Sequence, residues 1–307
     1  MVALERFEIF IPTTMIPVST LSVLTNLPKE MLSLYRVIYG LKTIPIWCGT
    51  IESFLLIPVT ALLKSPVNIS TIDFIIYVHT ASFVAPIGKS YLNNIKHRFG
   101  LRDVMSFEMT MYKCVSYFKV LEILSIIFLQ KHFSRALVLT GEVAFTPQLR
   151  VVPRSTLVGD AATAALFCSD GCNHCLLSVK NKIILGYEKG IYLPDDEMKK
   201  FDACFIVEMT KIIFDVLQMA ALTLKDIKVI LPHNVNIPTW KKIASALSFP
   251  LEKIYLKNIE KYGHCFCSDH LINLHSALAD KTIQKHDYYL MVGCGLGFYV
   301  SAAVFQY

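Results

Sequence analysis

The sequence predicts an α/β protein built in layers from two similar halves. With 307 residues, 54% of them hydrophobic and 18% charged, the chain can bury a large core. Strand-like and helix-like runs alternate along its whole length, which favours sheets covered by helices. Each half also contains a strand that leads to a polar or reactive residue, then a further helix, and ends in a pair of strands. We therefore expect two halves, residues 1–150 and 151–307, joined near residues 145–158.

Four strands are predicted in the first half. Residues 6–11 alternate between polar and apolar side chains, as a half-buried strand does, and Pro12 ends the run. β-branched and aromatic residues fill the other three runs, at 72–78, 104–111 and 134–140. The predicted helices are 28–40, 50–64, 90–99 and 115–132. The last of these is apolar on nearly every side, as expected for a helix buried at the centre of a large fold.

The second half begins with a turn and a strand of small residues at 159–167. Residues 175–185 follow with a strand-like pattern, and we expect them to be its hairpin partner. The remaining predicted strands are 227–231, a short one near 254–255, 288–292 and 298–305. The predicted helices are 201–223, 239–247 and one that opens at Gly263-His264 and runs to Ala279. Helix 201–223 is most simply explained by core packing.

The longest apolar or uncharged stretches do not have the pattern of a membrane span. A span needs about 20 consecutive apolar residues, whereas residues 9–28 contain three prolines and residues 43–63 contain two prolines and Glu52. Glu5 and Glu8 lie where a secretory signal would be basic. Nine cysteines, an odd number without a repeating framework, favour reduced thiols. We expect a cytoplasmic protein.

The net charge of +6 comes from scattered basic residues. Aromatic and basic residues do not share one stripe, so a nucleic-acid groove is not indicated. An acidic protein partner fits this surface better.

Cys114 is the candidate nucleophile. It lies between the strand at 104–111 and the apolar helix that follows, where the unpaired N–H groups of a helix start favour a thiolate. Cys168, Cys172, His174 and Cys175 resemble a zinc site, but no second Cys-x-x-Cys accompanies them. His264, Cys265, Cys267 and His270 form another dense group. We expect no metal at either place.

Four segments, in this order, resemble landmarks of the ketosynthase III branch of the thiolase superfamily. The similarity is good over residues 100–307 and poorer before residue 100. The landmarks are Cys114, Gly159-Asp160-Ala161, Pro232-His233-Asn234-Val235-Asn236 and Gly293-Cys294-Gly295-Leu296-Gly297-Phe298. The resemblance implies a thiolase fold with two βαβαβαββ halves in an α-β-α-β-α core.

The resemblance also implies a reaction. In that family a cysteine takes an acyl group from a coenzyme A or carrier-protein thioester and passes it to a second substrate, which divides one hard step into two easier ones. By resemblance, the N–H groups of Cys114 and Gly297 form the oxyanion hole. His233 is implied as the neutral imidazole that helps the thiol lose its proton.

His264 departs from the family pattern. Ketosynthase III enzymes usually have asparagine there, whereas elongating ketosynthases use two histidines with their cysteine. Two imidazoles can donate two N–H bonds to a developing enolate. A histidine can also act as a base towards an alcohol, an amine or an α-carbon, which asparagine cannot do.

Two departures concern the acyl donor. Pro238 stands where the form that binds coenzyme A has an arginine, and Leu34, Tyr35 and Tyr39 stand near its N-terminal tryptophan and arginine. We expect a phosphopantetheine arm on an acidic carrier protein to be the donor, with free acyl-CoA as the alternative and no permanently bound cofactor. The residues expected to contact substrate or carrier are Asn236, Arg154, Lys241 and Lys242.

The prediction is thus an acyltransferase that forms an acyl thioester on Cys114 and condenses it, in a Claisen reaction, with a second carrier- or CoA-bound substrate. Specialised lipid, polyketide or secondary-metabolite synthesis is the expected setting. Two alternatives remain: acyl transfer to oxygen or nitrogen, and a non-catalytic partner of an active homologue. Because enzymes of the family are dimers across a sheet edge, we expect a homodimer or a heterodimer with a related subunit.

Overall fold

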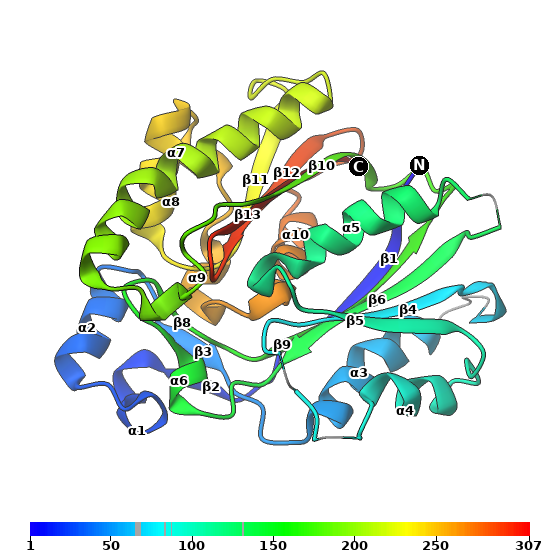
Figure 1. Ribbon diagram of the computed structural model, residues 1–307, viewed down its shortest axis with the longest axis horizontal. Helices are drawn as coiled ribbons and strands as arrows, with labels where there is room; N and C mark the ends of the chain where they lie inside the picture. The colour runs from blue at the N-terminus through cyan, green and yellow to red at the C-terminus, as the bar shows by residue number, and fades with distance from the viewer. Residues whose placement is uncertain (65–68, 83, 87, 131) are drawn as a thin grey trace.

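The structure is a computed structural model that describes residues 1–64, 69–82, 84–86, 88–130 and 132–307. Within these residues nine strands form one mixed sheet in the order β11-β12-β13-β10-β1-β9-β6-β4-β5 (Figure 1). The strands are β1 (Ala3–Phe10), β4 (Phe74–Val78), β5 (Met105–Met109), β6 (Arg135–Glu142), β9 (Ala161–Cys168), β10 (Cys175–Ile183), β11 (Ile227–Pro232), β12 (Tyr288–Gly295) and β13 (Tyr299–Gln306). The predicted α/β class is confirmed.

The sheet consists of two half-sheets that repeat one topology. In the first, β4 is parallel to β5 and β6, and β9 runs antiparallel to β6 and β1. In the second, β11 is parallel to β12, while β13 runs antiparallel to β12 and β10. A parallel bridge from Ile254 to Ile230 adds the counterpart of β5. We propose that the repeats divide between β9 and β10; the boundary at residues 150 and 151 stays a prediction.

One predicted pairing is wrong. Residues 175–185 are not the hairpin partner of 159–167, because β1 lies between β10 and β9. β9 is buried along its whole length and has two edges to satisfy, which pair with β6 and β1. The two half-sheets meet at one end of β1, where Ala3 lies opposite Cys175 and the Leu176 N–H donates to the Val2 carbonyl.

Helices form a layer between the two half-sheets and a layer outside each of them (Figure 1). Side chains of β4 show the division, because Phe74, Ile76 and Val78 pack into the central layer while Ile75 and Tyr77 pack outward. The central helices are α5 (Ser116–Ile127) and α10 (Asp269–Ala279), and the outer ones are α3 (Ile51–Lys64), α4 (Tyr91–Arg98), α7 (Asp195–Met219) and α8 (Ile237–Leu247).

Three helix boundaries differ from the prediction by five or six residues. α5 ends at Ile127 and not near residue 132. α10 begins at Asp269, after a 3-10 turn at Phe266–Ser268, so His264 lies in the preceding loop. α7 begins at Asp195, six residues early, because three acidic residues in its first turn favour a helix N-terminus there. The early start brings the first turns of α7 to the site described below.

Short elements complete the described part of the chain. They are α1 (Ser22–Thr25), α2 (Lys29–Val37), α6 (Pro147–Arg150), α9 (Lys257–Tyr262) and the strand pairs β2 (Met15–Pro17) with β3 (Thr43–Pro45) and β7 (Val151–Val152) with β8 (Thr156–Leu157). In the described part of the chain, no helix has both the length and the apolar character that crossing a membrane requires.

Candidate active site

Cys114 lies in a 3-10 turn, Lys113–Val115, between β5 and α5. The turn is tight: the Val115 N–H donates to the Tyr112 carbonyl, and Lys113 has a left-handed φ of 53°. The Tyr112 N–H donates to Ser116 Oγ, 3.1 Å away, which fixes the turn to the first residue of α5. Cys114 is 6% exposed. The structure therefore places the cysteine at the strand-to-helix junction that the sequence indicated.

One cavity of about 660 Å³ brings together Cys114, His233, His264 and Gly297. These residues come from four segments that are far apart in the sequence: the turn before α5, the end of β11, the loop after α9 and the β12–β13 connection. The volume is within the range of small-molecule sites. The cavity is therefore large enough for a substrate beside all four residues.

His233 is held as a neutral imidazole. Its Nδ1 accepts the Cys294 N–H at 3.3 Å, so the ring hydrogen lies on Nε2. Burial, together with the neighbouring His264 and His270 rings, lowers the pKa of His233 well below its usual value. The Trp240 indole donates to the His233 carbonyl at 3.1 Å and packs edge-on against its ring. His233 thus carries one N–H donor at neutral pH.

His264 has a different electrostatic environment. Its Nδ1 lies 2.6 Å from Oδ2 of Asp269, and both residues are buried. Burial is the largest single influence and lowers the pKa of His264, but Asp269, Cys114 and hydrogen bonds to both outweigh it and raise that pKa well above its usual value. Asp269 and Cys114 are thus the neighbours that raise the pKa of His264. That His233 assists the thiol stays a prediction.

The two imidazoles are neighbours with opposite properties. Their ring centroids are 5.7 Å apart, with the planes at 72°. The pKa of one is lowered and that of the other is raised. Such divergence between adjacent titratable groups is typical of a divided acid–base task.

The glycine-rich connection packs directly against the turn that carries Cys114. A side chain at Gly295 would overlap the Tyr112 carbonyl oxygen, so only glycine permits this approach. Gly297 and Cys294 line the cavity beside it. The backbone of the connection is therefore close to the nucleophile, as the predicted oxyanion hole requires.

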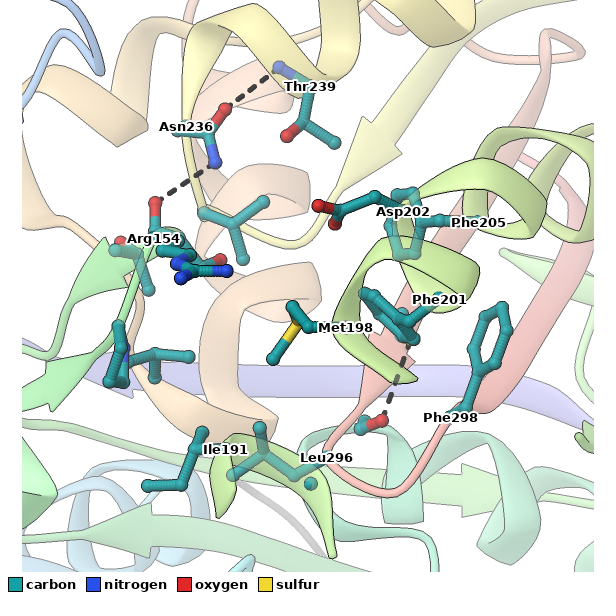
Figure 2. A pocket seen from close by; sticks show the side chains of 18 of the residues that line it. Arg154, Ile191, Met198, Phe201, Asp202, Phe205, Asn236, Thr239, Leu296 and Phe298 are labelled. Atoms are coloured by element: carbon teal, nitrogen blue, oxygen red, sulfur yellow. Dashed lines mark hydrogen bonds between the residues drawn. The ribbon is translucent and has the colours of Figure 1, made fainter. Parts of the chain in front are cut away.

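Three of the four residues predicted to contact the substrate or carrier line the cavity. Arg154, Asn236 and Lys242 line the cavity, whereas Lys241 is exposed and is not among its lining residues. Asn236 caps α8: its Oδ1 accepts the Thr239 N–H at 2.8 Å (Figure 2).

The other contacts of these residues are also within the protein. Asn236 Nδ2 donates to the Ser155 carbonyl at 2.9 Å, and Arg154 pairs with Asp195 at 3.2 Å. The amide of Asn236 is thus committed to holding two segments of the cavity wall together.

Aromatic side chains near the start of α7 form an apolar wall that the sequence interpretation missed. Phe201, Phe205 and Phe298 line the cavity together, with Met198 beside them (Figure 2). The Phe201 and Phe298 rings are 4.7 Å apart. Core packing does account for the later part of α7, where Ile212, Ile213, Val216 and Leu217 are buried.

Asp269 is the other residue that the sequence interpretation missed. The signal was an acidic residue five positions after His264, at the beginning of a helix. By contrast, Asp160 of the Gly-Asp-Ala landmark is structural, since it forms a buried bidentate pair with Arg150 at 2.7 and 2.8 Å. Across the residues described, no group of three or more His, Cys, Asp or Glu residues could hold a metal ion.

Known proteins share both the sequence pattern and the fold. The model of the "3-Oxoacyl-[acyl-carrier-protein (ACP)] synthase III C terminal" family matches residues 217–307. The β-ketoacyl-[acyl-carrier-protein] synthase III of Roseiflexus castenholzii is 30% identical over 100 residues, 33% of this chain. The chain spans only 30% of that relative's length. The enzyme of the same name from Fusobacterium nucleatum is 21% identical over 80% of both chains.

A solved structure extends the likeness to the whole chain. The 3-oxoacyl-[acyl-carrier-protein] synthase III of Aquifex aeolicus superposes with a TM-score of 0.83 at 18% identity, covering 100% of each chain. The predicted thiolase fold is confirmed. The molecule is a thiolase-fold protein in which one cysteine and two histidines share a cavity. The chain shares a ketosynthase III-like sequence pattern with these relatives and the synthase III fold over its whole length.

Proposed function

We propose that this protein is an acyltransferase that carries the acyl group as a thioester on Cys114. The observation that carries the proposal is the shared cavity, in which the Cys114 thiol interacts with His264 and His233 holds an N–H donor nearby. A thiolate attacks thioesters readily, and an adjacent imidazole supplies the proton transfer that such an attack needs. The oxyanion donors in the proposal are the N–H groups of Cys114 and Gly297.

The acylation step follows from these roles. His264 takes the thiol proton, and the Cys114 sulfur attacks the carbonyl carbon of the donor thioester. Negative charge develops on the carbonyl oxygen, where fixed backbone donors stabilise it. The old carbon–sulfur bond then breaks, and the leaving thiolate takes the proton back from His264.

We propose that the donor is an acyl-phosphopantetheine on a carrier protein, with acyl-CoA as the alternative. The cavity supports this because apolar residues, Phe298 and Phe205 among them, line it together with the exposed cations Lys242 and Arg154. An acidic carrier surface would meet those cations at the mouth. Condensation with a second carrier- or CoA-bound substrate, and the biosynthetic setting, stay predictions.

We also propose a dimer. β5 lies at the end of the sheet order, so one of its edges has no neighbour among the described strands. Met105 is 50% exposed and Met111 is 70% exposed beside that edge. An edge strand of this kind is suited to pairing with a second chain. Size-exclusion chromatography with light scattering tests the mass, and a monomer at micromolar concentration contradicts the proposal.

Intact mass after incubation with a panel of acyl-CoA and acyl-carrier thioesters tests the acyl-enzyme. We expect a mass increase equal to the acyl group on the wild type and none on Cys114→Ala. Cys48→Ala, which removes an exposed thiol that does not line the cavity, is the matched control and keeps the adduct. If no donor modifies the wild type, the non-catalytic partner alternative is favoured instead.

A further inference from the structure

We propose that Asp269 is a positioning residue that makes His264 a general base. With this base, the acyl group on Cys114 is transferred to a hydroxyl or amine acceptor. The inference rests on the proposed acyl-enzyme and goes beyond it by assigning the chemical class of the acceptor. It stands on the arrangement of hydrogen bonds around Asp269.

Both oxygens of the Asp269 carboxylate accept hydrogen bonds. Oδ2 accepts the Asn234 N–H at 2.6 Å, and Oδ1 accepts the Cys265 N–H at 2.7 Å. The Asn234 side-chain amide adds a longer bond to Oδ1 at 3.3 Å. Since Asp269 is an acceptor at both oxygens, the hydrogen in its 2.6 Å contact with His264 belongs to the imidazole Nδ1.

A buried network fixes the carboxylate in place. Asn273 donates to the Asn234 side-chain oxygen at 3.0 Å and to the Pro232 carbonyl at 2.6 Å. Asn258 in turn donates to Asn273 at 2.8 Å. These asparagines are buried, so their bonds are shielded from competing water. The network ties Asp269 to the end of β11, the same segment that carries His233.

Because Nδ1 of His264 is bonded to Asp269, only Nε2 is left to interact with Cys114. In the neutral ring Nε2 carries a lone pair. His233 presents the reverse, because its Nδ1 accepts a backbone N–H and its Nε2 carries hydrogen. Once His264 has lost its proton, the site has one donor and one base, whereas an enolate formed by decarboxylation is best stabilised by two donors.

The transfer step balances with these groups alone. The acceptor O–H or N–H proton moves to His264 Nε2 while the acceptor atom bonds to the acyl carbon. The tetrahedral intermediate then releases Cys114 as a thiolate, and His264 returns the proton to sulfur. His233, with its hydrogen on Nε2, lines the same cavity. No oxidant or reductant is needed.

Single-turnover decay of the acyl-enzyme tests the inference. Cys114 is first acylated to completion, as intact mass verifies, and then challenged with ethanolamine, glycerol or malonyl-CoA. We expect ethanolamine or glycerol to discharge the wild type faster than malonyl-CoA does. Asp269→Asn slows that discharge by about 100-fold or more, the usual size of a general-base contribution. Asp280→Asn, at the other end of α10, is the control and keeps the wild-type rate.

The pH profile separates positioning from simple structural support. The groups facing His264 are Cys114, His233, Asp269 and His270. Discharge of the wild type rises with pH as His264 loses its proton, and Asp269→Asn shifts this rise to lower pH because the carboxylate no longer favours the imidazolium. An unchanged profile, an unchanged Asp269→Asn rate, or faster discharge by malonyl-CoA with release of carbon dioxide overturns the inference.

A second measurement needs no substrate. Nitrogen-15 NMR of the imidazoles should show hydrogen on Nδ1 of His264 in the wild type, with the assignment made by His264→Asn, and loss of that state in Asp269→Asn. A His264 ring with hydrogen only on Nε2 in the wild type refutes the positioning role. Failure of the proposed function is seen separately, as absence of any acyl adduct on wild-type Cys114.

Discussion

Gly263→Ala is the sharpest test of how the site is positioned. Gly263 precedes His264 and has φ 62° and ψ −157°, a conformation that is essentially restricted to glycine. A Cβ added there would lie 2.7 Å from the Leu157 carbonyl oxygen, where contacts below 3.4 Å are already tight. His264 is pinned to the same segment, since its N–H donates to Leu157 and its carbonyl accepts the Gly159 N–H.

The geometry sets the size of the effect. Relieving the overlap requires a displacement of about 0.7 Å, and a shift of about 1 Å in a catalytic group can cost about 100-fold in rate. We expect the alkylation rate of Cys114 by iodoacetamide to fall by about 10- to 100-fold, because His264 no longer meets the thiol. Backbone strain and overlap together should lower the free energy of unfolding by about 3 kcal/mol.

Site-resolved peptide mass spectrometry after timed alkylation measures the rate at Cys114 separately, since Cys48 and Cys172 are exposed and can react as well. Gly100→Ala is the control: its φ of 70° imposes similar strain, but the added Cβ meets no atom within 4 Å. It should cost about 1 kcal/mol and leave Cys114 reactivity unchanged. If Gly263→Ala retains both the wild-type alkylation rate and the wild-type melting temperature, the argument that His264 is positioned through this backbone is refuted.

Three further predictions concern stability and the donor. Arg150→Leu leaves Asp160 buried without its partner and should lower the free energy of unfolding by about 3–5 kcal/mol in urea titrations; a loss below 1 kcal/mol would contradict this. Burial lowers the pKa of His174 to about 4, so the unfolded state binds more protons as the pH falls from about 6.5 to 4 and stability declines across that window. His174→Phe should remove about 2–3 kcal/mol of this pH dependence, and an unchanged dependence would show that other groups cause it. Lys242→Glu should raise KM about 5-fold for a carrier-bound donor but not for acyl-CoA, whereas Lys285→Glu should change neither; equal effects on both donors would exclude a carrier contact at Lys242.

Local patterns predicted the elements but not all of their partners. Alternation and β-branched content located β4, β6, β11 and β12 because those signals depend on each segment alone. The pairing of β9 was predicted wrongly because two segments adjacent in sequence look like a hairpin unless a distant strand is known to lie between them. That strand, β1, precedes β9 by about 150 residues, and periodicity carries no information about such a contact.

The residues of the candidate site that lie in a family motif could be named from the sequence, whereas a residue outside those motifs could not. Cys114, His233, His264 and Gly297 were all named from the sequence, and one cavity contains them. Asp269 was missed because an acidic residue at a helix start is usually a solvated N-terminal charge. Here it is buried, because the helix start lies under the His264 loop, and only the packing of distant segments reveals this.

The central place of β1 has a consequence for how the chain is made. Its residues 3–10 pair with β9 and meet β10, so this strand has no partner until residues 161–183 have been synthesised. At about 5–20 residues per second, a ribosome needs roughly ten seconds or more to supply them. During that interval a half-apolar strand with both edges open depends on chaperones or transient contacts. Substitutions that make β1 more aggregation-prone should therefore reduce the yield of folded protein more than its final stability.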